Sequence, residues 1–147
     1  MRKLKISKRL SESLYKSIRD DKWLLSRLDH LWTNYFGSVK QVNPVFIKFG
    51  RHSRLRLGSI RLDSINKNSY ITITGMFKDP RIPQEIVDHT IAHELCHYAH
   101  GFSSPKTRLH KYPHHGGVIK KELEARSLHH LVVAYAGWVK QYKRNLR

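Results

Sequence analysis

The sequence predicts a single domain of the α+β class, in which a helical N-terminal segment precedes a small sheet and two further helices. Apolar residues recur at spacings of three and four towards both ends of the chain, and they alternate with polar residues in the middle. The 147 residues suit one core, and 39% of them are hydrophobic. We therefore treat residues 1–147 as one domain, with its core over about 8–135 and a basic tail at 136–147.

The first half of the chain contains the N-terminal helical pattern and three candidate strands. Residues 8–36 have helical periodicity, which restarts near Asp20 as if two helices meet there. Strands rich in β-branched and aromatic residues are expected at Val45–Phe49, within 55–62 around a break at Gly58, and at Tyr70–Thr74. They predict a small, mostly antiparallel sheet. The last strand is either an ordinary interior strand or an open edge that pairs with an extended substrate.

The second half is predicted to hold two helices separated by a long loop. The first helix should run over about 83–100, with proline and acidic residues in its first turns, and should end at Gly101. Residues 101–114 form a loop that is long for so small a domain. A second helix starts at residue 116 or 117 and continues to about 136, after which the pattern is weak.

The chain is strongly basic. It has 28 Lys and Arg against 11 Asp and Glu, a formal net charge of +17. Such an excess favours polyanionic partners, which are either nucleic acids such as DNA or other acidic surfaces. No acidic residue lies between Lys40 and Arg61, and this stretch supplies the candidate nucleic-acid-binding residues Lys48, Arg51, Arg54, Arg56 and Arg61.

The only cysteine is Cys96, so neither an internal disulfide nor a cysteine-rich zinc ribbon can form. We expect it to be a buried thiol. The sequence has no apolar run near the length of about 20 residues that a membrane helix needs, and no secretory signal follows the basic N-terminus. These features predict a cytoplasmic protein, with association to a nucleoid or nucleus left open by the charge. They do not determine its oligomeric state, for which a monomer is the expectation.

The most informative motif is His93-Glu94-Leu95-Cys96-His97, which has the H-E-x-x-H form of zinc hydrolases. On a helix, His93 and His97 lie on one face about 6 Å apart and can bind one ion. Glu94 is rotated by about 100°, beside the metal, where it can act as general base. An apolar stripe of Val87, Ile91, Leu95 and Tyr98 points away from the histidines, so that one helix face packs on the core and another lines a cleft.

A catalytic zinc usually has three protein ligands and a water molecule. His100 lies about 10 Å from His93 along the helix axis, which makes it a poor third ligand. A loop histidine next to the flexible Gly116 and Gly117 could return over the helix, and a glutamate could serve from the second helix. The candidates are His100, His110, His114, His115, Glu122 and Glu124.

The order of these elements, with H-E-L-C-H on a helix and a later His-Gly before another helix, resembles the SprT-like family of zinc metallopeptidases. This family includes the Spartan proteases, which act on DNA–protein crosslinks. The resemblance covers about residues 8–135 and implies a minimal zincin-like protease domain. It implies one Zn²⁺ held by His93, His97 and His115, with His114 as the alternative third ligand and Glu94 as the general base. The chain departs from the family at Ile119, where an aromatic residue is usual, and in lacking the C-terminal zinc ribbon of many members.

The resemblance predicts a zinc metalloendopeptidase that cleaves proteins or peptides, among them proteins associated with DNA. Tyr98, Tyr112 and His114 are candidates for an additional oxyanion donor. Two alternatives remain at this stage: a nucleic-acid-binding module whose zinc site is structural or degenerate, and a zinc hydrolase of a non-peptide bond such as a phosphoester.

Overall fold

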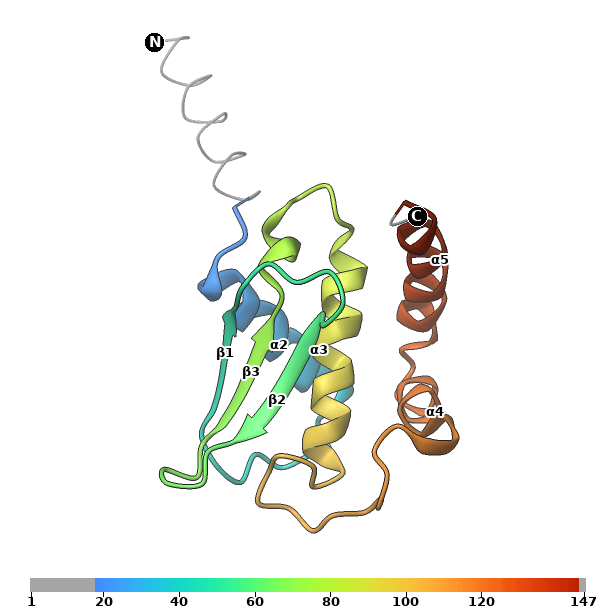
Figure 1. Ribbon diagram of the computed structural model, residues 1–147. Coiled ribbons are helices and arrows are strands. Elements are labelled where there is room, and N and C mark those ends of the chain that lie inside the picture. Colours follow the sequence, from blue (N-terminus) through green and yellow to red (C-terminus); the bar gives the residue numbers. More distant parts are fainter. Residues whose placement is uncertain (1–17, 146–147) are drawn as a thin grey trace, which may run out of the picture.

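The computed structural model describes residues 18–145 and confirms the α+β class. Figure 1 shows helices α2 (Asp21–Tyr35) and α3 (Gln84–Ala99) covering one face of a three-stranded sheet. Helices α4 (Val118–Ala125) and α5 (His129–Asn145) pack against α3 on the side away from β1. No helix of residues 18–145 is long and apolar enough to cross a membrane.

The sheet consists of β1 (Val45–Phe49), β2 (Gly58–Leu62) and β3 (Ser69–Ile73), in the order β1-β3-β2. β3 is antiparallel to β2 but parallel to β1, so the sheet is mixed and not mostly antiparallel as predicted. The sheet is mixed because β3 lies between β1 and β2, so these two consecutive strands do not pair with each other as a hairpin. β3 is therefore the central strand, which contradicts its role as an open edge, and β2 is the edge strand beside α3.

Helix α2 begins where the sequence pattern restarts. The Asp20 side chain caps it by accepting the Trp23 backbone N–H at 2.8 Å. The helix buries Leu24, Leu28 and Leu31 against the sheet and α3. The predicted helical segment at residues 8–17 lies outside the described residues.

Helix α3 is close to the predicted range, and its stripe of Val87, Ile91, Leu95 and Tyr98 is fully buried. It ends in a Schellman motif, in which Gly101 donates to the Tyr98 carbonyl at 3.1 Å and Phe102 to the His97 carbonyl at 2.9 Å. Gly101 has φ +75°, and a Cβ there would lie 2.3 Å from the Thr107 carbonyl oxygen. Glycine is thus required at the point where the chain leaves α3 for the long loop.

The C-terminal region is divided differently from the prediction. A short 3-10 turn at His115–Gly117 leads into α4, and a break after Ala125 separates α4 from α5. Ser127 adopts φ +62° at this break, and the following Leu128 is fully buried as an anchor. Helix α5 continues through Gly137 to Asn145, so residues 136–145 are not a separate tail. Trp138 packs edge-on against core Phe77 at 5.9 Å.

Candidate metal centre

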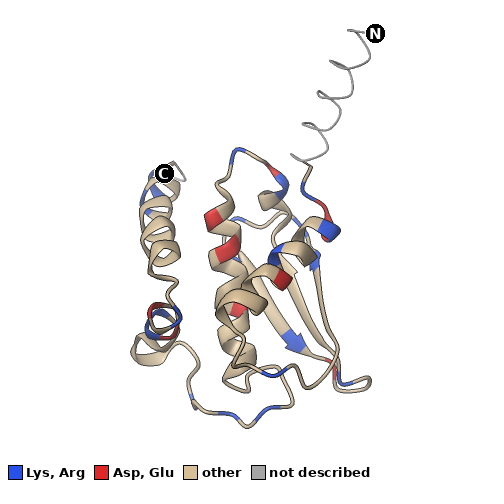
Figure 2. Cartoon of the chain, turned by 180° about the vertical axis from the view of Figure 1, so that it is seen from behind, with Lys and Arg blue, Asp and Glu red and all other residues tan. Residues whose placement is uncertain are grey.

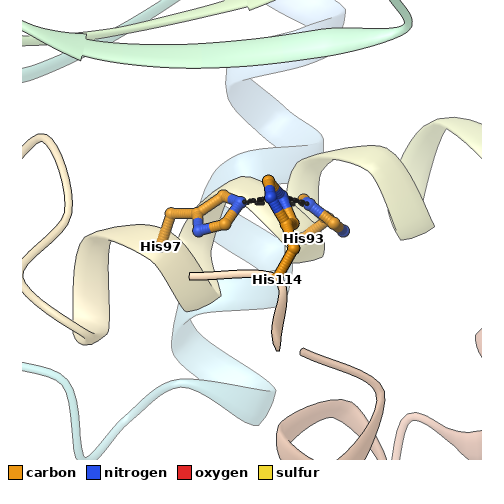
Figure 3. A group of neighbouring side chains, drawn as sticks. All are labelled: His93, His97 and His114. Carbon is orange, nitrogen blue, oxygen red and sulfur yellow. Dashed lines mark hydrogen bonds between the residues drawn. The ribbon is translucent and has the colours of Figure 1, made fainter. Parts of the chain in front are cut away.

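Three imidazole nitrogens meet at one point above helix α3 (Figure 3). His93 and His97, one turn apart on α3, place their Nε2 atoms 3.1 Å from each other. The Nε2 atom of His114, from the loop before α4, lies 3.2 Å from that of His93 and 2.9 Å from that of His97. The expected helical pair is thus completed by a histidine from the long loop.

The loop that carries His114 is fixed to the rest of the domain by polar contacts. Ser104 donates its hydroxyl hydrogen to the Tyr98 carbonyl at 2.8 Å, and Ser69 of β3 donates to the Ser103 carbonyl at 2.8 Å. The Leu109 N–H donates to the His100 carbonyl at 2.9 Å. These contacts hold the start and the middle of the loop against β3 and the C-terminal end of α3.

The donor set fits a cation better than it fits hydrogen bonding alone. A ring nitrogen of a neutral imidazole is either a donor or an acceptor, so three nitrogens in mutual contact cannot satisfy all three contacts by sharing protons. Zinc–nitrogen bonds of about 2.0–2.1 Å at tetrahedral angles separate the ligand nitrogens by roughly 3.3 Å. The observed separations of 2.9–3.2 Å are close to that value. His93, His97 and His114 are therefore suited to hold a zinc ion.

Burial keeps the two helix histidines in the protonation state that a metal requires. Desolvation lowers the pKa of His93 to about 4 and that of His97 to about 3. At neutral pH both rings are uncharged and can present lone pairs. The Nδ1 atom of His97 is buried and has no hydrogen-bond partner among residues 18–145. Its ring orientation is set by packing, with the Phe102 ring 5.3 Å away.

His115, the preferred third ligand at the sequence level, is not part of the cluster. Its ring is exposed and packs edge-on against Tyr112 at 5.4 Å. Consecutive side chains in such a turn project in different directions, so only one histidine of the pair can face α3, and the structure brings His114 there.

The other candidate ligands also lie elsewhere. His100 is 3.6 Å from Glu122, and its ring contacts that of His110. Glu124 is 3.5 Å from His129 at the surface.

Glu94 lies beside the histidine cluster in a water-poor position. Its side chain and that of His93 line the same hollow of about 220 Å³, between α3 and the residues leading into β2. The residue is 5% exposed, and burial raises its pKa to about 7, with Arg56 acting in the opposite direction. A Cβ at Gly58 would lie 2.7 Å from Thr90 and 3.2 Å from a Glu94 oxygen, so glycine permits this close approach of β2 to the carboxylate.

Two residues that the motif did not indicate also line the centre. Tyr135 of α5 stacks on His89 of α3, with ring centroids 4.0 Å apart and planes within 8°. Both side chains border the Glu94 hollow and a second hollow on the other side of His93. Sequence periodicity gave no signal for Tyr135, because nothing in the local pattern of α5 shows which helix it faces. Burial lowers the pKa of His89 to about 4.

The tyrosines proposed as oxyanion donors are not placed for that role. Tyr98 is fully buried on the core side of α3; its hydroxyl donates to Asn43 Oδ1 at 2.7 Å and accepts the Val42 N–H at 2.9 Å. Tyr112 is 57% exposed beside His115. The third candidate, His114, belongs to the cluster itself. Cys96 is a buried thiol, as expected, and burial raises its pKa.

Replacement of Tyr98 by phenylalanine should therefore reduce stability without affecting metal binding by the three histidines. Loss of the hydroxyl leaves the Val42 N–H and the Asn43 oxygen without their partner, which we expect to cost about 1–2 kcal/mol of unfolding free energy. Urea unfolding measures this loss. A large fall in the zinc affinity of folded Tyr98→Phe protein would contradict the structural role.

Four of the five candidate nucleic-acid-binding residues lie on β2 or in the loop that precedes it, and Lys48 lies on β1 at the other edge of the sheet. Arg51, Arg56 and Arg61 line a hollow of about 380 Å³ that also includes Gly58. Lys48 is exposed on β1, and Arg54 is exposed in the loop, where its carbonyl accepts from Tyr142 at 2.8 Å. Figure 2 shows the acidic residues mainly on the helices, and the strands themselves have none.

Comparison with known protein families, with characterised proteins and with solved structures gave no match. What the centre can do therefore follows from its own residues.

Proposed function

We propose that this protein is a zinc-dependent metallopeptidase whose centre consists of His93, His97, His114 and Glu94. The observation that carries the proposal is the convergence of three imidazole nitrogens within 3.2 Å of one another, beside a buried carboxylate on the same helix. Three protein ligands leave a fourth position for water, which is the arrangement of catalytic rather than structural zinc. The sequence resemblance to SprT-like peptidases points to the same activity.

A zinc ion held by the three histidines would lower the pKa of a bound water and polarise a carbonyl. Glu94 accepts the proton of the attacking water and returns it to the leaving amine. Its buried position suits this task, because burial penalises the charged carboxylate and so favours uptake of a proton.

The free edge of β2 is the part of the sheet best placed to hold an extended peptide. Its other edge pairs with β3, and its first residue, Gly58, lines the hollow that contains Glu94 together with the preceding residues 55–57. A peptide that adds to this edge would form backbone hydrogen bonds and pass directly over the centre. This assigns to β2 the substrate-holding role that the sequence had suggested for the central strand.

The hollow lined by Arg51, Arg56 and Arg61 supports a second part of the proposal, which is that this protein acts on proteins associated with DNA. It shares Arg56 and Gly58 with the Glu94 hollow, so a polyanion bound at Arg51, Arg56 and Arg61 would lie next to the cleft. The lone buried thiol fits a reducing, cytoplasmic site of action.

The activity is tested by incubating the zinc-loaded protein with unfolded casein and with single-stranded RNA, each with and without a chelator. We expect casein to be cleaved only without chelator, and RNA to remain intact. Cleavage of RNA alone would instead indicate a zinc hydrolase of phosphoesters. Failure to cleave either substrate, together with tight DNA binding, would favour a nucleic-acid-binding module.

The role of DNA is examined in the same assay by adding DNA at low and high salt. Replacement of Arg51, Arg56 and Arg61 by glutamine should weaken binding and reduce its salt dependence. The same change at Lys140, Lys143 and Arg144 of α5 is the matched control. Binding that does not respond to salt would contradict an electrostatic site.

A further inference from the structure

A second hollow adjoins the histidine cluster, and Glu94 is not among the residues that line it. It has a volume of about 340 Å³ and lies between α3, α4 and α5. His93 and His114 form its wall towards the metal centre. This volume is at the lower end of the range of about 300–1,000 Å³ for ligand pockets, which suits one large side chain rather than a whole cofactor.

The remainder of the lining is mainly apolar. Ile119 and Leu123 are buried residues of α4, and α5 contributes Val132, Tyr135 and Ala136. His89 also borders the hollow; Lys120 is the one lysine or arginine of the lining, and no carboxylate of residues 18–145 lines it. A lysine or arginine side chain would therefore find no counter-ion in the hollow and would be repelled by Lys120.

We propose that this hollow is the specificity pocket of the enzyme and receives a bulky apolar side chain, such as leucine or phenylalanine, of the residue next to the scissile bond. The inference rests on the proposed peptidase function, because it identifies the substrate residue that the same centre selects. A peptide carbonyl at the histidine cluster would place an adjacent side chain within reach of His93 and His114, and the hollow opens between those residues and the apolar faces of α4 and α5.

The pocket can be altered without disturbing the core. Ala136 is exposed at its rim, so Ala136→Phe should fill the hollow with an aromatic ring. Val133, also exposed on α5, does not line the hollow, and Val133→Phe is the matched control.

Cleavage is measured on paired fluorogenic peptides that differ at one position beside the scissile bond. Wild-type protein should prefer leucine or phenylalanine over alanine and lysine by at least about tenfold in kcat/KM, as expected for a hydrophobic pocket. Ala136→Phe should abolish this preference, because the leucine and phenylalanine peptides lose their advantage in kcat/KM once the hollow is filled. Val133→Phe should behave as wild type.

An independent readout uses the metal-free protein and requires no catalysis. In NMR titrations, N-acetyl-phenylalaninamide should shift the methyl signals of Ile119, Leu123 and Val132, and N-acetyl-lysinamide should not. Ala136→Phe should remove these shifts. Methyl shifts without peptide cleavage would support the pocket and refute the peptidase function. Cleavage with no side-chain preference and no methyl shifts would overturn the pocket and leave the peptidase function standing.

Discussion

Replacement of Glu94 by glutamine should abolish peptide hydrolysis while leaving zinc bound. The amide has nearly the same shape but cannot accept a proton from water, and general-base catalysis typically contributes about 10²–10⁴-fold to the rate. Because Glu94 is not one of the three clustered histidines, zinc content should remain at one ion per chain. Casein cleavage and metal analysis on the same preparation measure both effects.

The control for this variant is Glu124→Gln, which makes the same chemical change at an exposed position of α4. Its activity should equal that of the unaltered protein. Glu94→Gln should also retain or slightly increase its thermal stability, because burial penalises a carboxylate more than an amide. If Glu94→Gln cleaved casein at the wild-type rate, the role of general base would have to be assigned to another residue.

The part of the centre on α3 could be predicted from the sequence because a helix has a fixed geometry. Spacings of three and four determine which side chains share a face, so His93 and His97 were separated correctly from the buried stripe that includes Ile91 and Leu95. The same regularity identified the helix end at Gly101, where a left-handed residue is required.

The periodicity of the sequence could not predict features that depend on contacts between distant parts of the chain. Alternation identified the strands but not their partners, so the insertion of β3 between β1 and β2 was missed. The break at Ser127 is a positive-φ position at a residue type that gives no strong turn signal. Tyr135 contacts His89 because α5 packs on α3. The local sequence patterns of these two helices do not predict that packing.

The choice between His114 and His115 is a local case of the same difficulty. Both residues precede the glycines, and a loop without a repeating geometry does not fix which of two neighbouring side chains points inward. The contacts that decide it lie earlier in the loop, where Ser103 and Leu109 are tied to β3 and to the end of α3. The position of His114 is therefore a property of the folded domain.

Because His114 lies in the histidine cluster and His115 does not, we expect His114→Ala to lose zinc and His115→Ala to keep it. Removal of His114 leaves two histidine ligands, and we expect zinc affinity to fall by more than about 100-fold, since changes to residues that merely support ligands cost about 10–100-fold. His115 contacts Tyr112 outside the cluster, so its loss should leave the affinity unchanged. Competition with a chromophoric chelator measures both values.

Thermal unfolding provides a second measurement of the same difference. Zinc at about 100 times its dissociation constant stabilises a native state by about 2.7 kcal/mol. Added zinc should therefore raise the unfolding temperature of the wild-type protein and of His115→Ala, but not that of His114→Ala. The opposite pattern would show that His115 rather than His114 is the third zinc ligand, and that the loop before α4 adopts a different conformation when zinc is bound. Equal loss in both variants would mean that the loop as a whole, rather than one imidazole, completes the site.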